Sequence, residues 1–208
     1  MPPVVADSVL RRCVDLLVAV VLLIVLAPLL LAIGIAVRLS SPGPAVYRQP
    51  RVGRSGRVFT IWKFRTMVAN ADRTGPAVSG RTDARITPLG RLLRGSRLDE
   101  LPQLVNLLRG DITLVGPRPE VERYVSYYTG LERTLLSVRP GILGPGALLF
   151  ARQQCDELDT VGDPDAYYVM HHLHPKLALD LAYVTDRRLV SDVRLVVRAA
   201  LVIVGVRR

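Results

Sequence analysis

The stretch from Leu16 to Val37 reads LLVAVVLLIVLAPLLLAIGIAV and decides how this chain is organised. It carries no formal charge over 22 residues. As a helix it would measure roughly 33 Å, about the thickness of the hydrocarbon core of a membrane. A cleaved signal peptide has a shorter apolar core than this one. We therefore expect a membrane-anchoring segment that stays in the mature protein.

Pro28 lies near the middle of this run. A proline removes one helical hydrogen bond and bends the helix, which leaves two arms that are each too short to cross a membrane. Arginines flank both ends, with Arg11 and Arg12 before the run and Arg38 after it, so both ends prefer the cytoplasmic face. These features predict a re-entrant helix kinked at Pro28. A single span with a tolerated proline and an external N-terminus is the alternative.

The charge balance is strongly basic, with 28 Lys and Arg against 18 Asp and Glu, and only Lys63 and Lys176 are lysines. Such an excess suits a polyanionic partner: nucleic acid, an anionic membrane face or a phosphate-bearing substrate. The basic residues are dispersed among apolar runs and no nucleic-acid-binding motif stands out, so we expect no nucleic-acid partner. Cys13 and Cys155 have no spacing typical of a disulfide framework, which favours a reducing compartment.

The remaining chain predicts an α+β fold, a small and mostly helical domain with a short β-hairpin. The domain boundary is placed after residue 40, with an anchor over 1–40 and the second domain over 41–208. Strand-like stretches at 46–48 and 58–62 flank a turn at 53–56 and form the hairpin. The other expected elements are helices at 88–94 and 120–137, a helix from Asp99 or Glu100 to Arg109, a strand at 112–115, and loops at 70–83 and 153–165.

The tail from 186 to 208 places arginines along one helical stripe and aliphatic residues elsewhere. This pattern is typical of an amphipathic helix that lies along a membrane surface. A helix buried against the domain is the alternative.

Asp99 and Glu100 are adjacent carboxylates at the predicted start of a helix. The helix dipole favours their ionised forms there, and an ionised carboxylate can act as a nucleophile or as a magnesium ligand. An ordinary cap followed by a first-turn glutamate is the alternative. Cations gather around the pair in the sequence, and one of them, Arg118, is stiffened by prolines on both sides. Together these residues indicate a site that transfers a phosphate-linked group.

Five motifs occur in a characteristic order. They are Ser41-Pro42-Gly43-Pro44, Lys63-Phe64-Arg65-Thr66-Met67, Leu98-Asp99-Glu100-Leu101-Pro102-Gln103-Leu104, Leu114-Val115-Gly116-Pro117-Arg118-Pro119-Glu120 and Arg139-Pro140-Gly141-Ile142. The chain thereby resembles the bacterial sugar transferases, the monotopic polyprenyl-phosphate phosphoglycosyl transferases, in their minimal catalytic form. It departs from that pattern at Ala27, where many relatives carry serine, and over 143–147, next to the acceptor or sugar end of the site.

The resemblance implies transfer of a sugar-1-phosphate from a nucleotide diphosphate sugar, usually a UDP-sugar, to polyprenyl phosphate at the cytoplasmic face of the cell membrane. This is the first membrane step of envelope glycan assembly. In that scheme Asp99 forms a covalent phosphosugar intermediate with release of UMP and helps to hold Mg²⁺, and Glu100 positions the metal or assists proton transfer. The substrate-binding residues it implies are Lys63, Arg65, Arg94, Gln103, Arg118 and Arg139. A catalytically inactive scaffold of glycan assembly is the second hypothesis, and a basic membrane-tethered nucleic-acid-binding protein is the third. Whether the protein forms a homodimer is left open.

Overall fold

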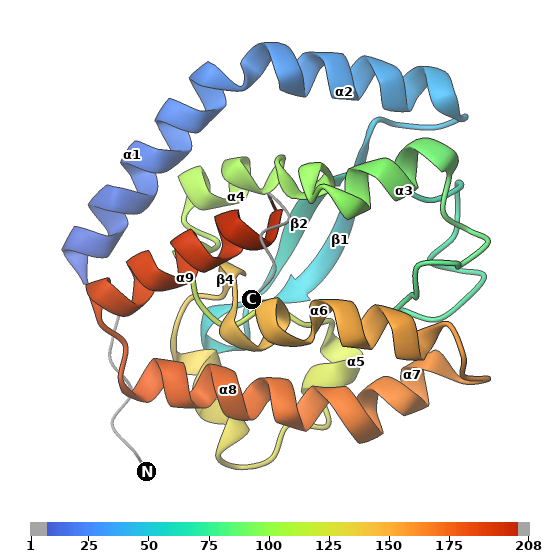
Figure 1. Cartoon of the computed structure of the whole chain (residues 1–208). Coiled ribbons are helices and arrows are strands. Elements are labelled where there is room, and N and C mark those ends of the chain that lie inside the picture. The colour runs from blue at the N-terminus through green and yellow to red at the C-terminus, as the bar shows by residue number, and fades with distance from the viewer. Residues whose placement is uncertain (1–7, 204–208) are drawn as a thin grey trace.

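The computed structural model describes residues 8–203, and its fold is α+β and mostly helical, as the sequence predicts (Figure 1). An arc of two helices lies along one side of a body in which helices surround two small sheets. The helices are α1 Val9–Val25, α2 Ala27–Ser40, α3 Pro88–Gly95, α4 Gln103–Arg109, α5 Glu122–Val125, α6 Pro145–Leu158, α7 Pro164–Tyr167, α8 His174–Thr185 and α9 Leu189–Ile203. The strands are β1 Val46–Val52, β2 Val58–Phe64, β3 Thr113–Val115 and β4 Gly141–Leu143.

The predicted kink near Pro28 is confirmed, since α1 and α2 are bent by 65° at Leu26. Pro28 lies in the first turn of α2, where its missing N–H would have had no helical partner, so it begins a new helix without leaving a broken hydrogen bond. Among residues 8–203 no single helix is long and apolar enough to cross a membrane. The bent pair passes that test only when its two helices are taken together.

Polar contacts fasten α1 to the body of the molecule. The Arg12 guanidinium donates to the carbonyls of Leu107 and Leu108 at 2.7 and 2.9 Å, where α4 ends. The buried Asp15 accepts the backbone N–H of Leu114 at 3.0 Å and the hydroxyl of Thr113 at 2.8 Å on β3. Three of these four bonds reach backbone atoms of α4 and β3, so α1 is held at a fixed position on the body.

The two sheets have two strands each. The predicted hairpin is confirmed: β1 and β2 pair antiparallel, with Val46 opposite Phe64 and Val52 opposite Val58. The parallel pair β3–β4 was not predicted beyond its first strand, because β4 is only three residues long. It depends on a close backbone approach, since a Cβ at Gly141 would collide with the backbone of Gly116.

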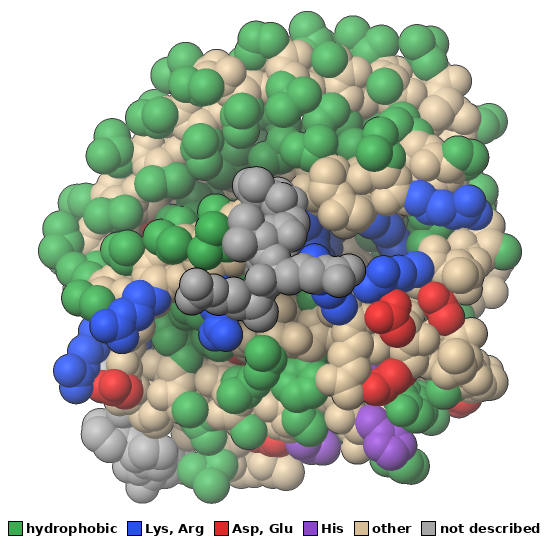
Figure 2. Space-filling view, in the orientation of Figure 1, with side chains coloured by type: hydrophobic (Ala, Val, Ile, Leu, Met, Phe, Trp, Pro, Cys, Tyr) green, Lys and Arg blue, Asp and Glu red, His purple; other side chains and the backbone are tan. Residues whose placement is uncertain are grey.

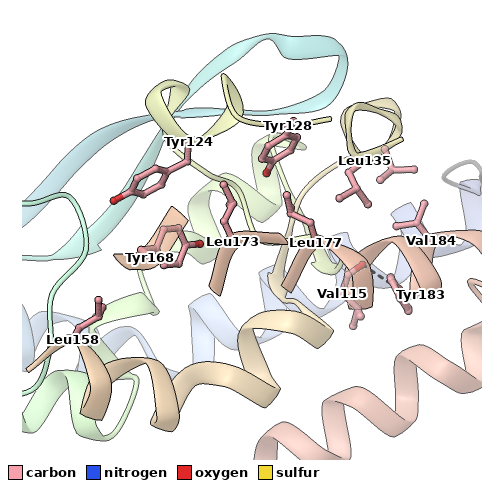
Figure 3. Close-up of a cluster of buried hydrophobic side chains, with 11 residues drawn as sticks. Val115, Tyr124, Tyr128, Leu135, Leu158, Tyr168, Leu173, Leu177, Tyr183 and Val184 are labelled. Carbon is pink, nitrogen blue, oxygen red and sulfur yellow. Dashed lines mark hydrogen bonds between the residues drawn. The ribbon is translucent and has the colours of Figure 1, made fainter. Parts of the chain in front are cut away.

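The largest buried cluster lies between α5, α8 and a π-helical segment, Tyr168–Leu173, that leads into α8 (Figure 3). Tyr124 and Tyr168 face each other there with ring centroids 4.8 Å apart. The other buried members are Val115, Tyr128, Leu135, Val138, Leu158, Leu173, Leu177, Tyr183 and Val184. This core supports the carboxyl end of β3 and the segment that follows it.

Two predicted segments are corrected. The expected loop at 153–165 is helical up to the end of α6 at Leu158 and again from the start of α7 at Pro164, and only residues 159–163 are irregular. Asp159, directly after α6, accepts the backbone N–H groups of Arg81 and Thr82 at 3.0 and 2.9 Å and so ties this short loop to the segment at 81–82. The expected helix at 120–137 is split into α5 and a 3-10 segment, Glu132–Ser137, by a turn at Gly130. The tail is helical over α9, as predicted, and residues 204–208 lie outside the described part.

Candidate active site

The Asp99–Glu100 pair lies on a 3-10 turn, Leu98–Glu100, that precedes α4. The expected continuous helix from Asp99 is therefore wrong. The N–H groups of Glu100 and Leu101 donate to the carbonyls of Arg97 and Leu98, three residues back, and the α-helical part begins only at Gln103. The turn is entered through Arg97, whose φ of 59° lies in the left-handed region that residues other than glycine seldom adopt. After this reversal of the chain, Glu100 lies within hydrogen-bond distance of Lys63 near the end of β2.

Glu100 is held between two cations. Its carboxylate accepts a hydrogen bond from Lys63 Nζ at 3.0 Å, from the end of β2, and another from the Arg118 guanidinium. Burial alone would raise the pKa of Glu100, but Arg118 and Lys63 together hold that pKa well below its ordinary value. Both hydrogen bonds reach the same oxygen, Oε1, so Glu100 is an anion that two protein cations hold in place.

Asp99 is in a different state from its neighbour. It is 8% exposed, and its Oδ1 is buried without a hydrogen-bond partner among the described residues. Burial, and then the charge of Glu100, raise the pKa of Asp99, while Lys63 and Arg94 oppose that rise. A more basic carboxylate with a free oxygen among cations is suited to nucleophilic attack on an electrophilic phosphorus or to binding a metal.

Arg94, in the last turn of α3, acts electrostatically on Asp99. Its guanidinium donates to the hydroxyl of Thr66 at 2.9 Å and to that of Ser79 at 2.7 Å. Ser79 belongs to the predicted loop at 70–83, which the structure confirms as irregular. Neither partner is charged, so the positive charge of Arg94 remains uncompensated by these contacts and is available to an anion.

Gln103 and Arg139 are the outlying members of the predicted set. Gln103 is 1% exposed on the first turn of α4, and its Nε2 is buried without a hydrogen-bond partner within residues 8–203. Gln103 and Asp99 are therefore neighbours in sequence that each carry an unpartnered buried polar atom. Arg139 is half-buried just before β4, whose first residue, Gly141, donates its N–H to the carbonyl of Pro117 at 2.8 Å.

The contacts of Arg65 differ from those expected of the substrate-binding residue that the resemblance implies. It is buried, and its guanidinium donates to the carbonyls of Val37, Ser41 and Pro42 at 2.7 to 3.0 Å. These are orphan carbonyls at and after the end of α2, which a cation at a helix C-terminus stabilises. The contacts of Arg65 thus join β2 to the arc, and no substrate-binding role follows from them.

We predict that Arg65→Ala lowers stability by about 2–3 kcal/mol, because it removes charge-assisted hydrogen bonds to buried carbonyls. The thermal midpoint of the purified protein in detergent should fall, with activity per folded molecule nearly unchanged. Arg57→Ala is the matched control, since Arg57 is exposed in the hairpin turn. A variant that keeps its thermal midpoint but loses activity would return Arg65 to the substrate-binding set.

A second buried polar cluster was missed by the sequence analysis. Glu120 accepts the hydroxyl of Tyr168 at 2.6 Å, and that hydroxyl in turn accepts a hydrogen bond from Lys176 Nζ at 2.9 Å. Asp180, one turn further along α8, is also buried. The one signal available in the sequence was Lys176 itself, which is a lysine in a chain whose cations are otherwise almost all arginines.

The fit of a magnesium ion can be judged from these oxygens. Among residues 8–203 no group of three or more His, Cys, Asp or Glu side chains could hold a metal ion. The unpartnered Oδ1 of Asp99 nevertheless suits a hard cation, and Mg²⁺ is commonly bound by one or two carboxylates together with substrate phosphates. The residues therefore fit a metal shared with a diphosphate.

A sequence model of the family described as bacterial sugar transferase matches residues 6–206, which is nearly the whole chain. The chain belongs to the bacterial sugar transferase family. It is therefore an enzyme of the sugar-phosphate transferase type, as its motifs predict. The Asp99–Glu100 turn and the Pro117–Pro119 turn lie within the matched region.

Curated relatives of this sugar transferase carry related names. It is 36% identical over 199 residues to the UDP-glucose:undecaprenyl-phosphate glucose-1-phosphate transferase of Caulobacter vibrioides, covering 94% of this chain and 70% of the relative. It is 33% identical to the Escherichia coli K12 protein of the same name, over 91% of this chain and 39% of the relative. It is 36% identical to the UDP-N-acetylgalactosamine-undecaprenyl-phosphate N-acetylgalactosaminephosphotransferase of Aeromonas hydrophila, over 77% and 39%. The chain thus spans well under half of the last two relatives.

Proposed function

We propose that this sugar transferase moves a sugar-1-phosphate from a UDP-sugar to a polyprenyl phosphate and uses Asp99 as the nucleophile. The observation that carries the proposal is the difference in hydrogen bonding between the two adjacent carboxylates. Glu100 is occupied by Lys63 and Arg118, whereas Asp99 keeps a buried oxygen without a partner. Relatives named for UDP-glucose or UDP-N-acetylgalactosamine support the substrate class.

The reaction proceeds in two displacements. A carboxylate oxygen of Asp99 attacks the β-phosphorus of the donor, the bond from that phosphorus to the bridging oxygen breaks, and UMP leaves with the electron pair. The phosphosugar is then bonded to Asp99. An oxygen of polyprenyl phosphate attacks the same phosphorus, Asp99 is released as a carboxylate, and polyprenyl-diphosphate-sugar forms.

The cations make these steps feasible, because a carboxylate and a diphosphate repel each other. Arg94 donates to two neutral hydroxyls and is placed to meet a phosphate close to Asp99. Lys63 and Arg118 neutralise Glu100 and leave a net positive surrounding for Asp99. Mg²⁺, held by Asp99 and the donor diphosphate, would screen phosphate charge when bound.

The same proposal places the arc of α1 and α2 in the cytoplasmic leaflet as a re-entrant anchor over residues 1–40. Figure 2 shows hydrophobic side chains crowding the rim formed by the arc, while Lys and Arg gather on the body beside it. The strongly exposed apolar residues of the arc include Val9, Leu10, Leu17, Ile24, Val25, Leu31, Ile35 and Leu39. A surface this apolar is costly to leave in water, which favours lipid as its surroundings. The exposed valines of α9 support the predicted second contact with the membrane surface.

We expect an N-terminal tag to be protected from externally added protease in intact cells and cleaved after permeabilisation, because a bent anchor returns both ends to one side. A tag fused to residue 208 is the matched control and should behave identically. Cleavage of the N-terminal tag alone in intact cells would establish the spanning arrangement instead.

The first half of the transferase reaction is tested without lipid, and the second half by adding polyprenyl phosphate. Purified protein is incubated with a panel of UDP-sugars and Mg²⁺ and analysed by intact mass. We expect at least one sugar to add the mass of its phosphosugar, with release of UMP, and polyprenyl phosphate to remove the adduct. If no UDP-sugar forms an adduct or supports transfer to polyprenyl phosphate, the scaffold reading replaces the enzymatic proposal.

A further inference from the structure

The single tryptophan of the chain, Trp62, lies on β2 in contact with two arginines. The guanidinium carbons of Arg48 and Arg109 are each 4.8 Å from the centroid of its ring. Arg48 stands opposite Trp62 on β1, and Arg109 is the last residue of α4. A guanidinium that stacks on an indole keeps N–H donors at its edge for an anion. We call these three residues the Trp62 cluster.

The two cations of the Trp62 cluster are not neutralised by the protein. Both are exposed, and within the described part of the chain neither has an acidic side-chain partner. Asp111, the acidic residue nearest to Arg109 in sequence, accepts a hydrogen bond from the Asn106 side chain at 2.9 Å instead. Asn106 also accepts the backbone N–H of Trp62 at 3.1 Å, which fastens β2 to α4. The cluster therefore presents two positive charges on a rigid support.

Both helices of the arc lie close to the Trp62 cluster. Arg12 of α1 donates to the carbonyls of the two residues that precede Arg109. Phe64 follows Trp62 by two positions and so points to the same face of β2, where it belongs to a buried cluster with residues of α2 (Figure 1). A re-entrant arc returns both of its ends to the level of the lipid headgroups, and the cluster lies next to those ends.

We propose that the Trp62 cluster binds the phosphate of an anionic phospholipid headgroup, at a site separate from the reaction centre. Lys63, the next residue, points to the opposite face of β2 and contacts Glu100. Tryptophan and arginine both favour the boundary between water and lipid, and anionic lipids of the cytoplasmic leaflet attract basic residues there. The site depends on the proposed placement of the arc in the membrane, and not on the transfer chemistry at Asp99.

The fluorescence of Trp62 reports on this site alone, because the chain has no other tryptophan. The full-length protein is placed in nanodiscs of phosphatidylcholine that contain a small fraction of one labelled lipid. The labelled lipid is phosphatidylglycerol or phosphatidylcholine, each with the same nitroxide near the glycerol end of one acyl chain. We expect the labelled phosphatidylglycerol to quench Trp62 about threefold more strongly than the labelled phosphatidylcholine, and added salt to reduce that difference.

The two arginines are tested together by combining Arg48→Gln with Arg109→Gln, which keeps the fluorophore. The ratio of quenching by the two labelled lipids should fall close to one. The matched control combines Arg57→Gln with Arg91→Gln, which removes two exposed arginines that do not stack on Trp62. It lowers the net charge equally and should retain most of the difference. Equal ratios in the two double variants would overturn the proposal, since the preference would then follow net charge alone.

Folding and membrane placement are followed in the same samples. If the double variant has no cooperative thermal transition, Arg48→Gln alone replaces it, and a ratio no lower than that of Arg57→Gln would overturn the proposal. Co-elution of the wild type with the nanodiscs reports the membrane placement of the arc. A wild type that co-elutes but is quenched equally by both lipids contradicts the headgroup site alone, whereas a wild type that does not co-elute contradicts the anchor and the site together.

Discussion

Asp99→Asn is expected to abolish both the phosphosugar adduct and overall transfer, with a loss of about 10³-fold or more. Asparagine is nearly isosteric, so the 3-10 turn and the ion pairs of Glu100 should survive. What disappears is the ionised oxygen that bonds to phosphorus. The measurement is intact mass for the adduct and radiolabelled transfer for turnover, and Asp186→Asn, a substitution at an exposed carboxylate, is the control.

The same variant decides which carboxylate reacts. Because Glu100 is fixed by two cations, its replacement by glutamine should weaken transfer but still allow an adduct to form. An adduct that persists in Asp99→Asn and disappears in Glu100→Gln would transfer the nucleophilic role to Glu100. Wild-type adduct formation should also decline in acid as Asp99 becomes protonated, at a pH above the usual carboxyl range because its pKa is raised.

Arg118→Ala has the second-largest expected effect, a fall in kcat of about 10²-fold. The substitution leaves Glu100 buried with Lys63 as its remaining cation, so the pKa of Glu100 rises and net negative charge grows beside Asp99. The diphosphate then meets stronger repulsion. Steady-state kinetics with a UDP-sugar, together with the thermal midpoint, separate this loss from unfolding.

Arg118→Lys is the informative companion. Lysine restores the charge but not the planar fork, and we expect it to recover part of kcat while remaining below the wild type. Arg123→Ala, which removes a largely exposed arginine paired with Asp165, is the control for a general loss of positive charge. Equal activity of Arg118→Ala and the wild type would remove Arg118 from the reaction centre.

Much of the local structure could be predicted because it depends on neighbours in sequence. The kink at Pro28 follows from a missing N–H, and the hairpin follows from strand-forming residues around a glycine-containing turn. The Asp99–Glu100 pair and its surrounding cations could also be found from sequence. The sequence could not predict that Glu100 is hydrogen-bonded to two cations while Asp99 keeps an unpartnered oxygen, because Lys63 and Arg118 come from distant segments.

The contacts that could not be predicted have the same origin. Arg65 is adjacent to site residues in sequence, yet its contacts are with carbonyls contributed by residues 37–42, which only the folded chain brings near. The acidic stretch after Gln153 has the composition of a loop, but long-range bonds from Asp159 to the segment at 81–82 accompany a helix there. Asp180 lacks any motif of its own, since the group it binds is the backbone N–H of Gly146, far away in the chain.

The docking of α1 has one more consequence. Arg12 and Asp15 bind α4 and β3 through four hydrogen bonds, and α4 directly follows the turn that bears Asp99. These bonds couple α1 to the elements next to the turn that bears Asp99. If the proposed function holds, the direction from which a lipid phosphate reaches Asp99 depends on how the first two turns of α1 are seated on the body.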